Sequence, residues 1–204
     1  MAYEIPQTKE EFERLVLAVK ETERLSFVKV VYRVMDELTE QARLNQNPPF
    51  VCSAGCSFCC HQLVCCTKME WRVIHEYLLG RGLLRGEIAH GFRDHKARWL
   101  SLYTRRPELF GPDLSTILSE HLGKPCPFLN GQRSCQIYPV RPVDCRTMYS
   151  KARCQDWKWP EVVRFPFPWD MWANNMILEE DKRSSGRNIM GVTPLPHWLC
   201  TIQF

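Results

Sequence analysis

Apolar residues recur at helical spacing near the start of the chain. They are Phe12, Leu15, Val16 and Val19, and then Val28, Val31, Met35 and Leu38. Thr8 and Glu11 precede this series at the spacing of a helix capping box. The pattern predicts one long helix over residues 8–44, or two helices joined by a bend, ended by the prolines of NQNPPF. The stretch SFVKVVYRV is rich in β-branched residues, which disfavour a helix there.

Short sequence signals also predict a strand and a helix directly after the first cysteines. LVCC, residues 63–66, predicts a short strand. Thr67 and Glu70 form a second capping box, and KMEWRVIHEYLL follows as a predicted helix that Gly80 and Gly82 end.

The rest of the chain changes character twice. Residues 86–106 and 113–122 have the pattern of two more helices, the second closed by Gly123. The segment KPCPFLNGQRSCQIYPVRPVDCRTMYSKARC then combines prolines and cysteines with an Asn-Gly turn, which predicts a small hairpin and loops. From Trp157 onward the chain is aromatic and proline-rich, so we expect an extended arm wrapping the core, with a polar loop at EEDKRSSGRN.

Cysteine is the most informative residue type, because VCSAGCSFCCHQLVCC places six cysteines within 16 positions. The chain has eleven, so they cannot all pair within one chain, and vicinal pairs suit a disulfide framework poorly. No secretory signal is visible at the acidic start, which favours the reducing cytoplasm. Clustered cysteines in that compartment indicate metal ligands.

The charge and the hydropathy of the chain argue against two other classes of protein, those that bind nucleic acid and those that span a membrane. The net charge of +4 is mild and scattered, without the basic stripe of a nucleic-acid-binding protein. No run of about 18 apolar residues is present, so we expect no membrane partner. An unknown protein or redox partner is the remaining expectation.

The spacing of the cysteines suggests one shared centre. Cys52, Cys56 and Cys59 form C-x3-C-x2-C, and Cys60 follows directly. Downstream, Cys126, Cys135 and Cys145 lie in the loop-rich segment that lacks a strong local fold of its own. A metal bound by both groups would tie the segments together, and its binding energy would become folding energy.

These residues resemble the YkgJ-type cysteine-cluster family, which is described as zinc- or iron-chelating. The resemblance rests on C-x3-C-x2-C-C, CPFL and CQIYPVRPVDCR, and spans residues 52–149. It implies the metal ligands Cys52, Cys56, Cys59, Cys60, Cys126, Cys135 and Cys145. Tyr138, Arg141, Pro142 and Arg146 also match, and the arginines either donate hydrogen bonds to thiolates or make ordinary contacts around a tight turn.

The chain departs from the family pattern in its first spacing and in its extra cysteines. The spacing leaves open which of Cys59 and Cys60 faces the metal. We expect Cys65, Cys66 and Cys200 to pack as core thiols. Cys154 could join the site but is not needed, and His61 could be a ligand but by default contacts solvent.

The identity of the metal stays open at this point. Seven thiolates exceed the four of a structural zinc site, so either two centres or spare cysteines follow. A [4Fe–4S] cluster takes four cysteines, and the close triplet with one distant cysteine suits it, which favours iron over zinc. A structural zinc protein acting as an interaction adaptor is one alternative.

A second alternative is an S-adenosylmethionine-dependent enzyme, of the radical type or related to methyltransferases. CSAGCSFC resembles the cysteine loop of radical S-adenosylmethionine enzymes, and flagellin lysine N-methylases carry a similar cysteine cluster. However, 145 residues follow Cys59, too few for a strand–helix barrel, for which about 200 is already short. The sequence does not decide whether the chain is an enzyme.

Together these patterns predict a compact single domain of the α+β class, mainly helical, with a cysteine-rich, loop-rich metal centre and a few short strands. The predicted parts are a helical N-terminal arm (1–47), a cysteine-cluster metal-binding core (48–156) and an aromatic, proline-rich C-terminal segment packed on that core (157–204).

Overall fold

The computed structural model describes residues 3–46, 48–52, 55–105, 122–156, 162–185 and 192–202. Its α-helices are α1 (Lys9–Thr22), α2 (Phe27–Leu44), α3 (Lys68–Gly80), α4 (Gly86–Arg105), α6 (Val143–Arg146), α7 (Pro168–Ser185) and α8 (Leu195–Leu199). Its strands are β1 (Cys65–Cys66), β2 (Met148–Ser150), β3 (Val162–Arg164) and β4 (Thr193–Pro194), and its 3-10 turns include η1 (Phe58–His61) and η3 (Tyr138–Val140). The mainly helical α+β prediction is confirmed.

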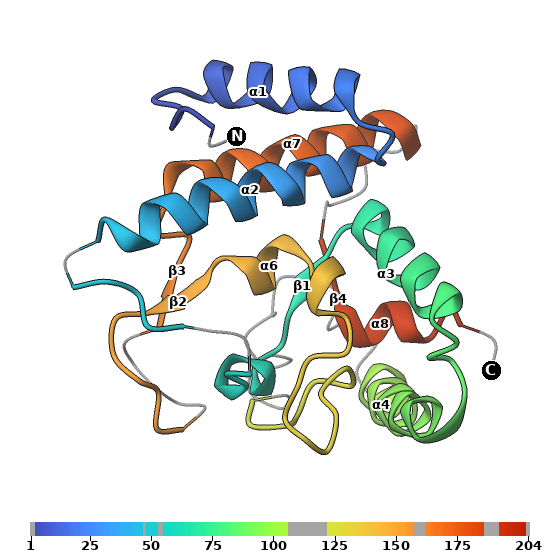
Figure 1. Cartoon of the computed structure of the whole chain (residues 1–204). Coiled ribbons are helices and arrows are strands. Elements are labelled where there is room, and N and C mark those ends of the chain that lie inside the picture. Colours follow the sequence, from blue (N-terminus) through green and yellow to red (C-terminus); the bar gives the residue numbers. More distant parts are fainter. Residues whose placement is uncertain are drawn as a thin grey trace.

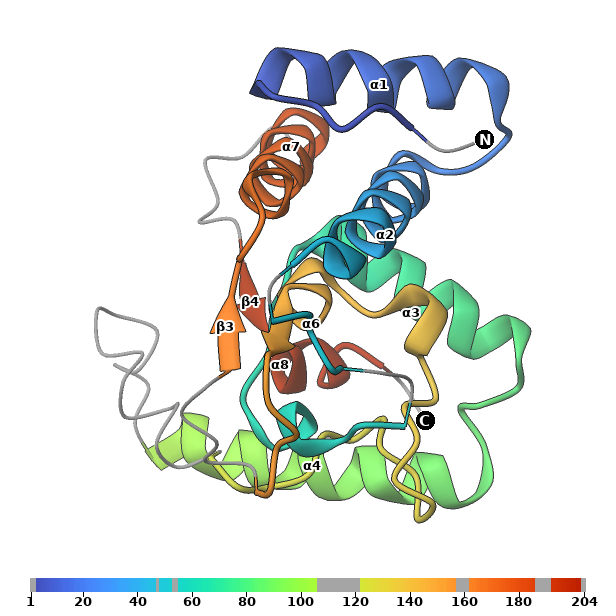
Figure 2. The ribbon, with the colours of Figure 1, turned by 60° about the vertical axis from the view of Figure 1, so that its left-hand side comes forward.

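The helices form two groups with short strands between them. Figure 1 shows α1 stacked on α7 and α2 at one end of the molecule, and α4 beside α8 at the other. Figure 2 shows the same order from another side, with α6 and the strands in the middle. One large apolar core joins these parts, from Phe12 on α1 through Ile177 on α7 to Leu199 on α8.

The N-terminal pattern forms two helices joined by a bend. The Thr8 hydroxyl accepts a hydrogen bond from the Glu11 backbone N–H (3.2 Å), and the Glu11 carboxylate accepts one from the Thr8 N–H (3.3 Å). Between the helices, Glu23 and Ser26 have extended backbone, which separates α1 from α2. The capping box and the bent alternative are both confirmed.

The β-branched stretch is helical despite its composition. Val28, Val30, Val31 and Val34 lie within α2, and all four are buried. Burying a valine contributes roughly 1.5–3 kcal/mol, whereas its cost in a helix relative to alanine is below about 0.7 kcal/mol. Packing therefore outweighs intrinsic preference.

The second capping box and the short strand also form as predicted. The Thr67 hydroxyl accepts from the Glu70 N–H (3.1 Å), and α3 runs from there to Gly80. Gly82 follows with φ +66, a left-handed conformation that favours glycine. The predicted helix at 113–122 lies outside the described residues.

The C-terminal segment differs from the prediction. We expected an extended arm and a polar loop at EEDKRSSGRN, but α7 continues to Ser185 and α8 follows, so both expectations were wrong over the described residues. Trp169, Ala173, Met176 and Ile177 are buried at helical spacing, and α7 packs on α1 and α2. The polar residues up to Ser185 form the last turns of α7.

The strands make two small antiparallel sheets within the described part of the chain. β1 pairs with β4, so Cys65 lies opposite Pro194, and β2 pairs with β3. Both sheets lie next to the cysteine-rich turns. None of the described helices has the length and apolar character needed to cross a membrane.

Candidate metal centre

The first cysteine run ends in a tight turn. In η1, the Cys60 N–H donates to the Ser57 carbonyl (3.1 Å) and the Gln62 N–H donates to the Cys59 carbonyl (3.2 Å). A 3-10 turn has three residues per turn, so adjacent side chains point about 120° apart. Cys59 and Cys60 are adjacent in this turn and therefore face different directions.

The second cysteine segment is joined to the first through its backbone. The Cys126 N–H donates to the Cys60 carbonyl at 2.6 Å. An antiparallel bridge joins Leu129 to Cys135, and the Asn130 side chain accepts hydrogen bonds within the intervening turn. The predicted Asn-Gly hairpin is thus confirmed, and it returns Cys135 toward Cys126.

Further contacts hold the two segments side by side. The Arg133 guanidinium donates to the Ser57 hydroxyl (3.0 Å) and lies over the Phe58 ring, 5.1 Å from its centroid. The Gly123 N–H donates to the His61 carbonyl at 2.8 Å. The His61 ring itself contacts the Ser57 carbonyl (3.1 Å) and is only partly exposed.

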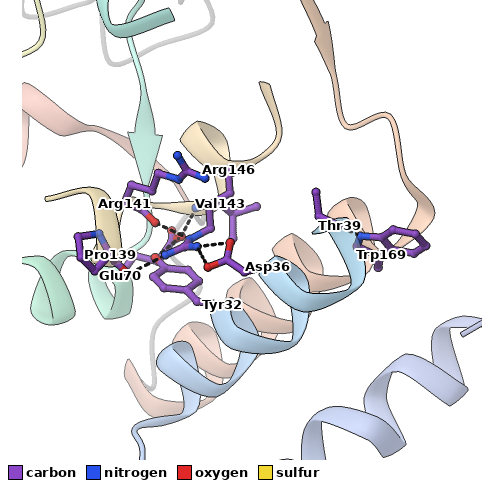
Figure 3. Close-up of polar contacts among 9 residues, drawn as sticks. All are labelled: Tyr32, Asp36, Thr39, Glu70, Pro139, Arg141, Val143, Arg146 and Trp169. Atoms are coloured by element: carbon purple, nitrogen blue, oxygen red, sulfur yellow. Dashed lines mark hydrogen bonds and ion pairs between the residues drawn. The ribbon is translucent and has the colours of Figure 1, made fainter. Parts of the chain in front are cut away.

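Cys145 lies on α6, whose start is fixed by a buried carboxylate. One oxygen of Glu70 accepts hydrogen bonds from the Val143 N–H (2.8 Å) and the Tyr32 hydroxyl (2.9 Å). Its other oxygen accepts from the Thr67 N–H (2.8 Å). Burial raises the pKa of Glu70, and these hydrogen bonds oppose that rise. One side chain thereby joins α2, α3 and α6, as Figure 3 shows.

Arg146 fixes the other end of α6. Its guanidinium donates to the Asp36 carboxylate on α2 and to the backbone carbonyls of Pro139 and Arg141 (both 2.8 Å). It also lies over the Tyr32 ring, 4.1 Å from the centroid. Figure 3 shows these contacts converging from three elements. Of the two roles left open for the arginines, the contacts of Arg146 are those of a structural residue around a tight turn.

Asp144 connects α6 to the strands. Its carboxylate accepts hydrogen bonds from the Cys65 N–H of β1 and from the Arg164 guanidinium of β3, both at 2.9 Å. Burial raises its pKa, while the bonds from Cys65 and Arg164 lower it. The segment that carries Cys145 is therefore anchored on both sides.

A cavity of about 420 Å³ lies where these elements meet. Its wall includes all seven cysteines indicated by the sequence: Cys52, Cys56, Cys59, Cys60, Cys126, Cys135 and Cys145. The remaining wall includes Asp36 and Thr39 of α2 and Tyr149 of β2. Over the described residues, no group of three or more His, Cys, Asp or Glu side chains is placed so that it could hold a metal ion. The thiols thus share one space without forming a coordination site there.

Arg141 brings a positive charge to this cavity. It lines the wall and stacks on Tyr138, with its guanidinium carbon 4.0 Å from the ring centroid. Its Nε is buried and, in the described part of the chain, has no hydrogen-bond partner. Burial raises the pKa of Cys60 to about 11, and the charge of Arg141 opposes part of this rise. The side chain is therefore placed to compensate negative charge on the thiols.

Burial favours the neutral form of several thiols in the cavity wall. Burial raises the pKa of Cys59 to about 12 and that of Cys145 well above its ordinary value, and nearby cysteines add to both effects. A thiol with a raised pKa is a poor nucleophile, which disfavours thiol-based catalysis. Forming several thiolates here requires a compensating cation, as metal binding provides.

All eleven cysteines are free thiols, and the four extra ones, Cys65, Cys66, Cys154 and Cys200, are not part of the cavity wall. Cys66 is fully buried in the apolar core, and Cys65 is partly buried in β1. Cys200 packs against a small separate cluster of Leu63 and Trp99. The positions of Cys65, Cys66 and Cys200 agree with the expectation that these cysteines pack as thiols in the core.

Sequence reasoning missed the residues that hold the site in place. Tyr32 and Asp36 looked like ordinary positions of a helix, and Glu70 looked like a capping residue. Their partners lie far along the chain: Glu70 to Val143 spans 73 positions. No local pattern reports such contacts.

Comparison with known proteins identifies no relative. No family model matches the chain, and neither the curated proteins nor the solved structures contain a significant match.

Proposed function

We propose that this chain is a metal-binding protein whose clustered cysteines hold iron as an iron–sulfur cluster, with zinc as the alternative metal. The observation that carries the proposal is the shared cavity, lined by cysteines from two distant segments of the chain. The resemblance to the YkgJ-type family supports the same seven ligands. The proposed cofactor is a [4Fe–4S] cluster.

The donor set fits soft metals. Thiolates bind both zinc and iron–sulfur clusters, and hard cations such as magnesium prefer oxygen ligands. The cavity volume of about 420 Å³ gives room for a group of several atoms as well as for a single ion. Volume and the close C-x3-C-x2-C triplet both support iron.

A bound iron–sulfur cluster would supply one-electron storage and transfer. The seven cysteines provide more than the four thiolates that such a cluster needs. Arg141 would offset the negative charge of the cluster and its thiolates, and its stacking on Tyr138 keeps the guanidinium at the cavity wall. A redox role, with a protein partner that exchanges electrons, follows from this chemistry.

The test is the metal and acid-labile sulfide content of protein purified without oxygen, together with its absorption spectrum. We expect iron with matching sulfide and a broad absorption band in the visible range. Cys145→Ser should lose metal, because its thiol belongs to the proposed ligands. Cys200→Ser is the matched control and should keep the wild-type content.

The outcomes separate the alternatives. Zinc without sulfide would assign a structural zinc centre and favour the adaptor role. Protein without any transition metal, from cells supplied with iron and zinc, would overturn the proposal. A cluster spectrum that shifts on adding S-adenosylmethionine would favour the enzyme alternative, although the described strands form two small antiparallel sheets and no strand–helix barrel.

A further inference from the structure

The cavity that the seven cysteines line also has an apolar wall. Val64, Ile137, Met148 and Leu195 belong to it and are buried, and the ring of Tyr149 lies beside them. The cavity volume of about 420 Å³ falls within the range of about 300–1,000 Å³ that is usual for small-molecule sites, which combine apolar walls with a few polar groups. The cavity therefore has the size and the lining for a small organic molecule as well as for a metal.

The charged side chains of the described wall leave one positive charge unmatched. Arg43 donates to both carboxylate oxygens of Glu40, at 2.5 and 2.6 Å, and Arg146 donates to both oxygens of Asp36. Arg141 is the third arginine of the wall. The charge of Asp36 also reaches Arg141, but the Asp36 oxygens are hydrogen-bonded by Arg146. Three arginines and two carboxylates thus leave one positive charge when the thiols are neutral.

Arg141 also has a hydrogen-bond donor that nothing in the described structure uses. Its Nε is buried and has no partner among the described residues. A positive charge can act on the thiols through space, whereas a donor needs an acceptor within about 3.5 Å. Buried polar groups in folded proteins are nearly always hydrogen-bonded, so an unsatisfied one calls for a partner from outside the chain.

The guanidinium of Arg141 is held in place before any ligand binds. It stacks on the ring of Tyr138, with its carbon 4.0 Å from the ring centroid. The Arg141 backbone carbonyl accepts a hydrogen bond from the Nε of Arg146 (2.8 Å), which fixes the main chain at this position. Figure 3 shows the Arg141 side chain extending away from the contacts of Glu70 and Arg146. A group fixed in this way loses little freedom when it binds a ligand.

We propose that the cavity binds a small organic carboxylate with a single negative charge, whose carboxylate contacts Arg141 and whose apolar part lies against Ile137, Met148 and Leu195. The planar guanidinium matches a carboxylate in shape and can donate two parallel hydrogen bonds to it. A phosphate ester brings close to two negative charges, which exceeds the one unmatched positive charge. This inference goes beyond the proposed function, because it assigns an organic ligand and does not require the metal.

Benzoate is the probe, and its neutral counterpart benzamide has nearly the same shape. Isothermal titration calorimetry should measure both on the full chain purified without oxygen, with the metal content of the same sample determined in parallel. We expect benzoate to bind at least about tenfold more tightly than benzamide, because only benzoate gives Arg141 a charged acceptor. Acetate should also bind more weakly than benzoate, because it lacks the apolar ring.

Variants locate the carboxylate. Arg141→Lys keeps the positive charge that compensates the thiols but lacks the Nε donor and the planar guanidinium. We expect it to keep the wild-type metal content and to bind benzoate about tenfold more weakly or worse. Tyr138→Ala removes the stacking from a partly exposed position and should weaken benzoate binding severalfold. Arg72→Gln, at an exposed position of α3 outside the cavity wall, is the control and should bind benzoate as the wild type does.

The outcomes decide the inference separately from the proposed function. Folded wild-type protein that does not bind benzoate, or that binds benzamide equally well, would overturn it. Unchanged benzoate affinity in Arg141→Lys, shown to be folded by circular dichroism, would do the same. Loss of both metal and benzoate binding in that variant would attribute the carboxylate to the metal and overturn it as well. If Arg141→Lys does not fold, unchanged affinity in Tyr138→Ala is the contradicting result.

Wild-type protein that binds benzoate but contains no metal would support the carboxylate site while overturning the proposed function. Metal without benzoate binding would do the reverse.

Discussion

Asp170 lies at the start of α7, and its side chain is buried. One of its two carboxylate oxygens accepts a hydrogen bond. That oxygen accepts from the Phe167 N–H at 3.2 Å, and the other has no partner among the described residues. Burial raises the pKa of Asp170 to about 7, although the bond from Phe167 opposes the rise. The folded protein therefore binds a proton here more tightly than the unfolded chain, whose ordinary Asp pKa is 3.8. The contribution of this group to stability is full below pH 3.8 and is lost as the pH rises through about 7.

We expect Asp170→Asn to stabilise the fold at pH 8 and to change little at pH 4. Each pKa unit corresponds to about 1.4 kcal/mol, so the ceiling is about 4 kcal/mol, and relaxation should reduce the gain to about 1–3 kcal/mol. Urea unfolding of both proteins at the two pH values measures this. An equal effect at pH 4 and pH 8 would show that the ionised carboxylate is not the cause.

At the scale of elements, the junction of α2, α3 and α6 depends on Glu70. Its carboxylate accepts three hydrogen bonds, from Tyr32, Thr67 and Val143, and each comes from a different part of the chain. Arg146 adds the contact to Asp36 on the same face of α2. The short helix α6 is therefore held by side chains of its neighbours, since four residues are too few for a helix that is stable alone.

We expect Glu70→Gln to lower the free energy of unfolding by about 1–3 kcal/mol, because the amide nitrogen would face a buried N–H or hydroxyl donor. Glu76→Gln, on the exposed face of the same helix, is the matched control and should change it by less than about 0.5 kcal/mol. Denaturant unfolding compares them. Equal stability of the two variants would contradict this role of Glu70.

At the scale of the whole molecule, two helical groups enclose a cysteine-rich middle with little regular structure of its own. The segment 122–156 contains η3, α6 and β2, each of three or four residues. The three-helix stack of α1, α2 and α7 has its own apolar contacts. A bound metal would therefore stabilise the middle more than the stack.

We expect removal of the metal by a chelator to lower the melting temperature and to raise hydrogen exchange chiefly in 122–156. The amides of α1 and α2 should remain comparatively protected, because these helices also pack on each other and on α7. Hydrogen exchange with mass spectrometry measures both regions in one sample. Uniform loss of protection across the chain would indicate one cooperative unit and contradict this expectation.

Much of the local structure could be predicted because its causes act within a few residues. Thr8 and Thr67 start helices through hydrogen bonds to residues three positions away, and Gly82 ends one through its own backbone angle. The C-terminal segment shows the limit of this reasoning. Trp169, Ala173 and Ile177 have helical spacing, but tryptophan and proline content suggested an arm instead.

The candidate site was predictable in its residue types and not in its geometry. The dense cysteines and the CQIYPVRPVDCR segment indicated seven ligands, and all seven line one cavity. The sequence could not indicate Tyr32 or Asp36, since Asp36 meets Arg146 across 110 positions. It also left the role of Cys154 undecided, because this residue lies outside the motifs that carry the resemblance.

The sequence by itself determined the helices, the turn signals and the thiol chemistry, since capping, backbone preference and ligand softness are properties of short segments. Only the tertiary structure decided which cysteines face one another and which side chains fix them there. Buried groups such as Glu70 and Arg141 acquire their partners and their pKa values from elements that meet only on folding.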